Sequence, residues 1–194
     1  MDSNIPDEAF WNRRYKSCPQ GSGVGSRGEF AKVKLAHVQK CMKEEEIESI
    51  VDLGCGDLYW IKHLDTLKYT GVDFSQTVIA KNRQIKPKWV FKCIDFSEEE
   101  IDEKADLTIC LDVLIHQPTF RQHNIVIENA LKSSEKILLI AGYRFKPKRV
   151  PQTMYFYETI FEALERRGID YQNIYSYRES AILKVKRQSS ELET

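Results

Sequence analysis

The sequence lacks two features that would direct it to a membrane or to nucleic acid. None of its apolar runs approaches the roughly 18 residues of a membrane-spanning helix. Its 29 Lys and Arg residues balance its 29 Asp and Glu residues, so the formal net charge is zero. A neutral chain does not carry the broad positive potential with which basic domains attract nucleic acids and anionic membranes. Neither is therefore expected as its primary partner.

The sequence also lacks a cysteine pattern. Its five cysteines are odd in number, far apart and never arranged as Cys-x-x-Cys. This spacing argues against disulfides and against a metal site. The first residues, MDSN, do not combine a basic and an apolar segment as a secretion signal does. We therefore expect a cytoplasmic protein without a bound metal.

The order of the expected elements indicates an α/β fold. Strand patterns recur at 50–53, 69–74, 89–94, 107–111 and 137–141, separated by segments of helical length. Consecutive parallel strands need such long connections, so the alternation predicts a doubly wound, mostly parallel sheet. An amphipathic helix is expected at 155–167. Two β-rich runs follow at 171–177 and 181–186. The connection between them, 178–180, is so short that it permits only an antiparallel hairpin, which completes a seven-stranded sheet.

Length and composition predict one core with two flanking segments. A chain of 194 residues that is 42% hydrophobic can bury one compact core. Residues 1–45, with a glycine-rich loop at 18–28 and a helix at 29–43, are expected to form an N-terminal cap or lid. Residues 46–187 are expected to form the main domain, and 188–194 a disordered tail.

The run IVDLGCGD at 50–57 is the most informative motif, because a short apolar strand breaks there into a Gly-x-Gly turn. Two glycines let the backbone approach a ligand closely, and a helix expected after the turn would offer free N–H groups to it. Nicotinamide and flavin enzymes use similar turns, but their third glycine is replaced here by Tyr59. A bulky side chain at this position disfavours a diphosphate cofactor and hence a hydride-transfer enzyme.

Acidic residues recur where the predicted strands end. Asp73 stands nineteen residues after Gly54, at the distance where a carboxylate binds ribose hydroxyls in dinucleotide folds. Ligands of open α/β sheets bind beyond the carboxyl ends of the strands. Five polar side chains should therefore converge at one edge: Asp57, Asp73, Asp95, Asp112 and His116.

Together these motifs resemble those of the class I S-adenosylmethionine-dependent methyltransferases, in the same order and over about residues 47–187. The resemblance implies that main domain 46–187 binds S-adenosylmethionine and releases S-adenosylhomocysteine. It also implies that Asp73 binds the ribose and that Asp95 and Phe96 meet the adenine. The cofactor-binding residues expected from it are Trp11, Tyr15, Asp52, Gly54, Cys55, Gly56, Asp57, Asp73, Phe74, Asp95, Phe96 and Leu111.

The glycine-rich run 21–28 and the aromatic residues before it resemble the N-terminal segment of small bacterial methyltransferases. In one interpretation the segment folds over the cofactor, with Trp11 or Tyr15 shielding the sulfonium and Ser26 or Arg27 touching the acceptor. In the other it is a flexible linker whose aromatic residues dock on the core.

His116 is the candidate general base, with Asp112 as a second catalytic residue. An imidazole with an ordinary pKa near 6.5 suits proton removal near neutrality. A histidine that is merely hydrogen-bonded at the start of a helix is the alternative. Of the other histidines, His37 and His63 fall in predicted helices and His123 is expected at the surface.

The basic run YRFKPKR at 143–149 offers Tyr143 and Arg144 as residues for an anionic acceptor, or forms a solvated loop. The run LDVL at 111–114 lacks the Asn/Asp-Pro-Pro-Tyr/Phe signature of amino-group nucleic-acid methyltransferases, which argues against a nucleic-acid acceptor. We expect methylation of a small molecule, at an oxygen of a sugar, phosphorylated metabolite or natural-product intermediate. A protein or RNA methyltransferase and a non-catalytic cofactor-binding scaffold remain alternatives, and the oligomeric state stays open.

Overall fold

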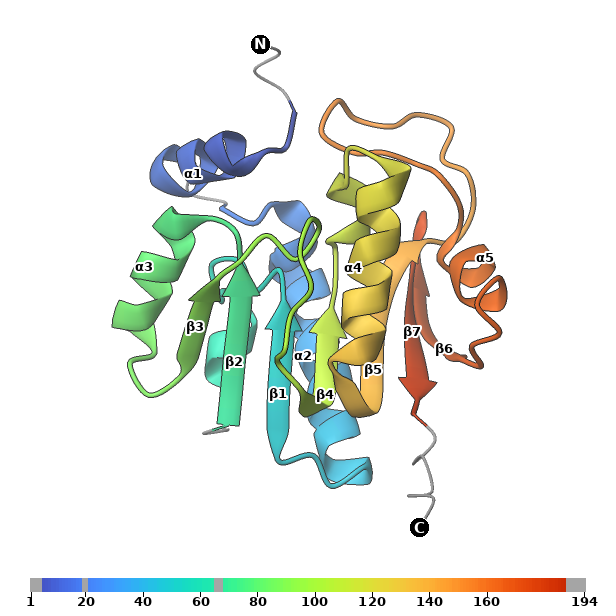
Figure 1. Ribbon diagram of the computed structural model, residues 1–194, viewed down its shortest axis with the longest axis horizontal. Coiled ribbons are helices and arrows are strands. Elements are labelled where there is room, and N and C mark those ends of the chain that lie inside the picture. Colours follow the sequence, from blue (N-terminus) through green and yellow to red (C-terminus); the bar gives the residue numbers. More distant parts are fainter. Residues whose placement is uncertain (1–4, 19–20, 65–67, 188–194) are drawn as a thin grey trace.

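Seven strands form one sheet, as predicted. The computed structural model describes residues 5–18, 21–64 and 68–187, so the predicted tail 188–194 lies outside the described residues. The strands are β1 (Ser49–Leu53), β2 (Lys68–Asp73), β3 (Val90–Cys93), β4 (Ala105–Cys110), β5 (Ser134–Tyr143), β6 (Gln172–Tyr177) and β7 (Ser180–Lys186). Their order in the sheet is β3-β2-β1-β4-β5-β7-β6 (Figure 1). β1 to β5 pair in parallel, and β7 runs antiparallel between β5 and β6. This confirms the doubly wound sheet with a C-terminal hairpin.

The helices cover both faces of the sheet. They are α1 (Glu8–Ser17), α2 (Gly28–Glu44), α3 (Gln76–Ile85), α4 (Phe120–Lys132) and α5 (Ile160–Glu165), with short 3₁₀ helices η1 (Val24–Ser26), η2 (Ile61–His63) and η3 (Leu114–His116). α2 and α4 lie on opposite faces (Figure 1). None of the described helices is long and apolar enough to cross a membrane.

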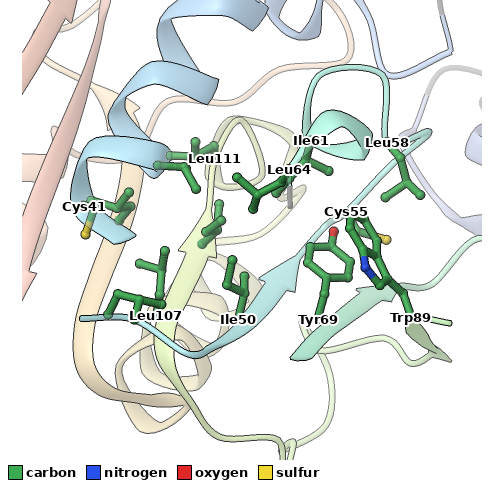
Figure 2. Packing of buried hydrophobic residues seen from close by; sticks show 14 of the residues in the cluster. Cys41, Ile50, Cys55, Leu58, Ile61, Leu64, Tyr69, Trp89, Leu107 and Leu111 are labelled. Atoms are coloured by element: carbon green, nitrogen blue, oxygen red, sulfur yellow. The ribbon is translucent and has the colours of Figure 1, made fainter. Parts of the chain in front are cut away.

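Alternating strand residues build a core on each face. On the α2 face, Ile50 packs with Leu107, whereas on the α4 face Val51 packs with Leu138. Figure 2 shows the α2-side core, in which the rings of Tyr69 and Trp89 lie side by side with their centroids 4.1 Å apart. Neighbouring side chains of a strand thus enter different cores, the pattern of strands that are buried on both faces.

Two predicted crossover helices are absent, and the last helix is shorter than predicted. Among the described residues between β1 and β2, η2 is the one helical turn, because left-handed φ angles at Gly54, Gly56 and Leu58 interrupt the helix expected after the glycine turn. Between β3 and β4 the chain turns at Asp95, whose carbonyl oxygen accepts from the Glu98 N–H at 3.0 Å. α5 begins only at Ile160, behind a Thr159 capping box, and not at residue 155.

The expected surface position of His123 is wrong. The residue is 6% exposed and lies on the inner face of α4, in contact with the rings of Phe120 and Tyr157. Glu158 is its nearest carboxylate, with Oε1 3.8 Å from Nδ1. Burial lowers the pKa of His123 to about 4, because the charged imidazolium loses its hydration.

Replacement of His123 by Gln should weaken the acid sensitivity of the fold. The pKa is lower in the folded chain than the unfolded value near 6.5, so the neutral ring stabilises the fold above pH 6.5. This contribution is lost as the pH falls from about 6.5 to 4 and amounts to at most about 3 kcal/mol. Urea unfolding at pH 7.5 and 5 should show a smaller loss for His123→Gln than for the wild type. The exposed His63→Gln is the control, and equal losses in all three proteins would contradict the assignment.

Candidate active site

The glycine turn brings the backbone of β1 against its neighbours. Gly54 and Gly56 have φ angles of 76° and 54°, a region that side chains disfavour. A Cβ on Gly54 would clash with Val113, and one on Gly56 would clash with Ser22. The N–H of Gly54 donates to the carbonyl oxygen of Val72 at 2.8 Å, which fixes the turn beside the end of β2.

Two buried carboxylates lie beneath this turn. Asp73 accepts from the N–H groups of Gly56 at 3.1 Å and Ser75 at 2.9 Å. Asp52 accepts from the Tyr69 hydroxyl at 2.7 Å. Burial raises the pKa of Asp52 to about 7 and that of Asp73 to about 6, and the hydrogen bonds offset only part of the lost hydration. Both side chains therefore titrate close to neutrality.

An aromatic ring and a carboxylate follow β3. The Asp95 carboxylate accepts from the N–H and the hydroxyl of Ser97, at 3.0 and 2.6 Å. The neighbouring Phe96 is buried, and its carbonyl oxygen accepts from the Asn129 side chain of α4 at 2.8 Å. The end of β3 therefore offers a flat apolar ring beside a hydrogen-bond acceptor, the combination that suits a purine base.

The N-terminal segment is docked on the glycine turn. The Ser22 hydroxyl donates to the Asp57 carboxylate at 3.1 Å and accepts from the Asp57 N–H at 3.1 Å. Arg27 forms an ion pair with the same carboxylate, and its guanidinium lies 4.1 Å from the centre of the Tyr59 ring. α1 is held to α3, because the Asn12 side chain accepts from the Ser75 hydroxyl at 2.7 Å. These contacts favour the interpretation in which the segment covers the site.

The end of β4 carries the two predicted catalytic residues. Asp112 has a φ of 63° and forms an ion pair with Lys34 of α2, a residue that the sequence did not indicate. In η3, Nδ1 of His116 lies 2.7 Å from the carbonyl oxygen of Thr153. A carbonyl can only accept, so Nδ1 carries the hydrogen and Nε2 keeps its lone pair. Burial lowers the pKa of His116, which favours this neutral form.

Most of the predicted site residues line one cavity of about 290 Å³. This volume is near the lower end of the roughly 300–1,000 Å³ typical of ligand pockets. The predicted residues in its wall are Trp11, Tyr15, Ser26, Asp52, Gly54, Cys55, Asp57, Asp73, Phe74, Asp95, Phe96, Leu111, Asp112 and His116. The sequence did not indicate several further lining residues, among them Ser22, which lies in the glycine-rich run 21–28, and Trp60 and Gln117, which no motif marks.

Four predicted residues do not line this cavity. Gly56 lies under Ser22, and Arg27 binds Asp57 from outside the wall. Tyr143 lines a separate small cavity beside Tyr155, and the N–H of Arg144 donates to the carbonyl oxygen of Glu179 at 2.8 Å. The structure thus separates Tyr143 and Arg144 from the other candidate acceptor residues.

Cys55 has the surroundings of a structural residue. Its thiol is buried, and the Asn82 amide lies 3.7 Å from the sulfur. Burial raises the pKa of Cys55 far above the ordinary value, with further contributions from Asp73 and Asp52. The thiol therefore stays protonated and is no nucleophile.

The cavity wall is acidic and aromatic. Its carboxylates are Asp7, Glu8, Asp52, Asp57, Asp73, Asp95 and Asp112, and no Lys or Arg of the described chain lines it. Its aromatic rings are Trp11, Tyr15, Tyr59, Trp60, Phe74 and Phe96. Carboxylates and aromatic faces both attract organic cations. The residues present therefore fit a nucleoside that carries sulfonium and ammonium charges.

Comparison with known proteins identifies the domain. Residues 51–139 match the family described as "Methyltransferase domain". This part of the chain is therefore a methyltransferase domain, and the fold is that of the class I S-adenosylmethionine-dependent methyltransferases. This confirms the resemblance in the sequence, the fold class and the cofactor, because the family uses S-adenosylmethionine and releases S-adenosylhomocysteine.

Two solved structures share the fold over almost the whole chain. Magnesium protoporphyrin IX methyltransferase from Synechocystis PCC 6803, with bound S-adenosylmethionine, is 20% identical, with a TM-score of 0.66 over 97% of this chain and 98% of the other. N-methyltransferase NodS from Bradyrhizobium japonicum WM9, with S-adenosylhomocysteine, is 12% identical, with a TM-score of 0.66 over 95% and 98%.

A curated relative matches in sequence over about half of the chain. This "Putative methyltransferase 235L" of Invertebrate iridescent virus 6 is 26% identical over an alignment of 102 residues, which covers 49% of this chain. The match spans only 37% of the length of the viral protein.

Replacement of Asp52 by Asn should stabilise the fold at high pH. The folded pKa of about 7 exceeds the ordinary 3.8, so the protonated form stabilises the fold below about pH 4, and this contribution is lost as the pH rises through 7. Asn keeps an acceptor for Tyr69 and carries no charge. We expect the free energy of unfolding to rise by about 1–4 kcal/mol at pH 8 and to change little at pH 4.

Urea unfolding at both pH values measures this effect, and Asp106→Asn is a control of opposite sign. The Asp106 carboxylate accepts from the Glu48 N–H at 2.8 Å and pairs with Lys136 at 3.1 Å. Burial acts to raise the pKa of Asp106, but these partners outweigh it and the pKa is lowered. The charged form of Asp106 therefore stabilises the fold at pH 8. An Asp52→Asn protein that loses stability at pH 8 would contradict the assignment.

Proposed function

We propose that this methyltransferase acts on a hydroxyl group of a small molecule, with His116 as the general base. The observation that carries the proposal is the hydrogen bond of His116 Nδ1 to the carbonyl oxygen of Thr153, at 2.7 Å beside the cavity. The bond fixes the tautomer in which Nε2 can accept a proton. S-adenosylmethionine supplies an electrophilic methyl group when bound. The chain's own task is to orient the acceptor and to take up its proton.

The surroundings of Asp112 support His116 rather than Asp112 as the base. The Asp112 carboxylate is engaged by the Lys34 ammonium, whereas Nε2 of His116 is left as an acceptor by its tautomer. The ring edge of Trp11 lies against His116, with 5.2 Å between centroids, and restricts rotation of the imidazole. Asp112 then contributes a fixed negative charge to the cavity wall.

A small acceptor is supported by the elements that enclose the cavity. Residues 1–45 are proposed to act as a cap, since Ser22 and Arg27 both bind Asp57 beside the cavity. On another side, the loop after β5 folds over η3, where the Tyr155 N–H donates to the carbonyl oxygen of Ile115 at 2.8 Å. A volume of about 290 Å³ leaves little room for a protein or RNA acceptor beside the cofactor.

An amine acceptor is the second candidate. An alkyl amine is protonated near neutrality, and the acidic and aromatic wall of the cavity attracts such a cation. The anionic acceptor expected from the sequence has less support, because Tyr143 and Arg144 stand apart from the cavity.

Replacement of His116 by Ala should abolish turnover and spare cofactor binding. Loss of a general base typically lowers kcat by about 10²–10⁴-fold. Acceptors are first identified with the wild type, by S-adenosylhomocysteine release from a panel of neutral hydroxyl compounds and amines. Because burial lowers the pKa of His116, wild-type kcat should rise with pH through a value below 6.5 and then level off.

Calorimetry with S-adenosylhomocysteine should give equal affinities for the wild type, His116→Ala and the exposed control His63→Ala. Unchanged turnover in His116→Ala would refute the base. If the wild type binds S-adenosylhomocysteine but methylates no compound of the panel, a non-catalytic scaffold would be favoured instead.

A further inference from the structure

Lys34 is a charged residue on the buried face of α2. This face also carries Ala31, Val38 and Cys41, at helical spacing, and Lys34 itself is only 6% exposed. Its ammonium donates to the carbonyl oxygen of Gly25 at 2.7 Å and forms the ion pair with Asp112. Burial of an ammonium is costly unless partners replace its hydration, so a lysine in this position calls for a specific reason.

Asp112, the partner of Lys34, also lies close to the backbone of Gly25. Asp112 has a left-handed backbone and its side chain is 30% exposed, in the wall of the cavity. A Cβ added to Gly25 would stand 2.6 Å from Oδ2 of Asp112, the oxygen that Lys34 also contacts. Lys34, Gly25 and Asp112 therefore form one contact cluster, in which a side chain at position 25 would displace the carboxylate.

We infer that Lys34 is a positioning residue of the cofactor site, which acts through Asp112 and through the carbonyl oxygen of Gly25. It holds the Asp112 carboxylate in one orientation at the cavity wall, and it ties the N-terminal segment to the end of β4. The inference rests on cofactor binding in this cavity, as the proposed function does. Its electrostatic reach extends to Asp52, whose pKa the Lys34 charge acts to lower.

Lys34→Met tests the inference, with S-adenosylhomocysteine as the probe in calorimetry. Met fills similar space but leaves the Asp112 carboxylate without its counter-ion. We expect the affinity to fall at least tenfold at pH 7. The matched control is Lys32→Met on the same helix, because Lys32 is 76% exposed and pairs only with Glu29 in the described structure. Lys32→Met should bind as the wild type does.

A double-mutant cycle separates positioning from a merely structural role. If Lys34 acts through the Asp112 carboxylate, Lys34→Met should lower the affinity in the wild type but not in an Asp112→Asn background, because the ion pair is already absent there. A loss of the same size in both backgrounds would contradict positioning. Thermal unfolding should show the double variant Lys34→Met/Asp112→Asn recovering most of the Tm lost in Lys34→Met.

Gly25→Ala perturbs the same carboxylate without changing Lys34 and covers the case that Lys34→Met fails to fold. The backbone of Gly25 is not left-handed, so the substitution acts through the contact with Asp112. It should lower the affinity severalfold in the wild type and not in Asp112→Asn. Lys34→Met and Gly25→Ala proteins that bind like Lys32→Met would overturn the inference while the proposed function stands. A wild type that binds no S-adenosylhomocysteine would overturn both.

Discussion

Parallel pairing of β1 with both β2 and β4 determines where the site lies. Asp52 is in register with Gly71 on one side and with Ile109 on the other. The three strands therefore end at the same edge, where Asp57 after β1, Asp73 at the last position of β2 and Asp112 after β4 reach one cavity. Because the strands are buried on both faces, little solvent reaches the carboxylates beneath the turn. The raised pKa values of Asp52 and Asp73 follow from this arrangement.

The site therefore opposes the stability of the fold that carries it. Above pH 7 the Asp52 carboxylate is charged and can attract a cation, but its charge then lowers the free energy of unfolding. The surrounding structure offsets part of this cost with fixed donors: the Tyr69 hydroxyl for Asp52, two backbone N–H groups for Asp73, and the Lys34 ammonium for Asp112. Each donor also fixes the direction of its carboxylate. Stabilisation and orientation of the site thus come from the same contacts.

The sequence predicted the strands and the acidic strand ends well, since both follow from local patterns. Apolar runs mark strands that are buried on two faces, and a polar residue after each run marks the edge where ligands bind. It predicted the crossovers poorly. The loop after β3 is held by Asn129 of α4, which donates to the carbonyl oxygens of Phe96 and Glu99 from 33 and 30 residues away, and no local signal reports such contacts.

The missed site residues share a physical reason. Lys34 belongs to an amphipathic helix, where a lysine normally faces solvent, and only the tertiary position of Asp112 explains its burial. The partner of His116 is the backbone carbonyl of Thr153, which has no side-chain signature at all. The prediction for His123 is wrong because a polar imidazole gives no local sign of the two aromatic rings that it contacts in the folded chain. Partners that lie far apart in sequence, or on the backbone, are visible only in the folded chain.

The Asp57 carboxylate has a consequence for the kinetics of binding. Its acceptor sites hold the hydroxyl of Ser22 and the guanidinium of Arg27 at the same time. A cationic group that seeks this carboxylate competes with a piece of the protein already seated there. Binding of such a group to Asp57 therefore requires that Ser22 or Arg27 first release the carboxylate, which makes association slower than a diffusion-limited encounter. Salt would speed this step, because screening weakens the ion pair between Arg27 and Asp57.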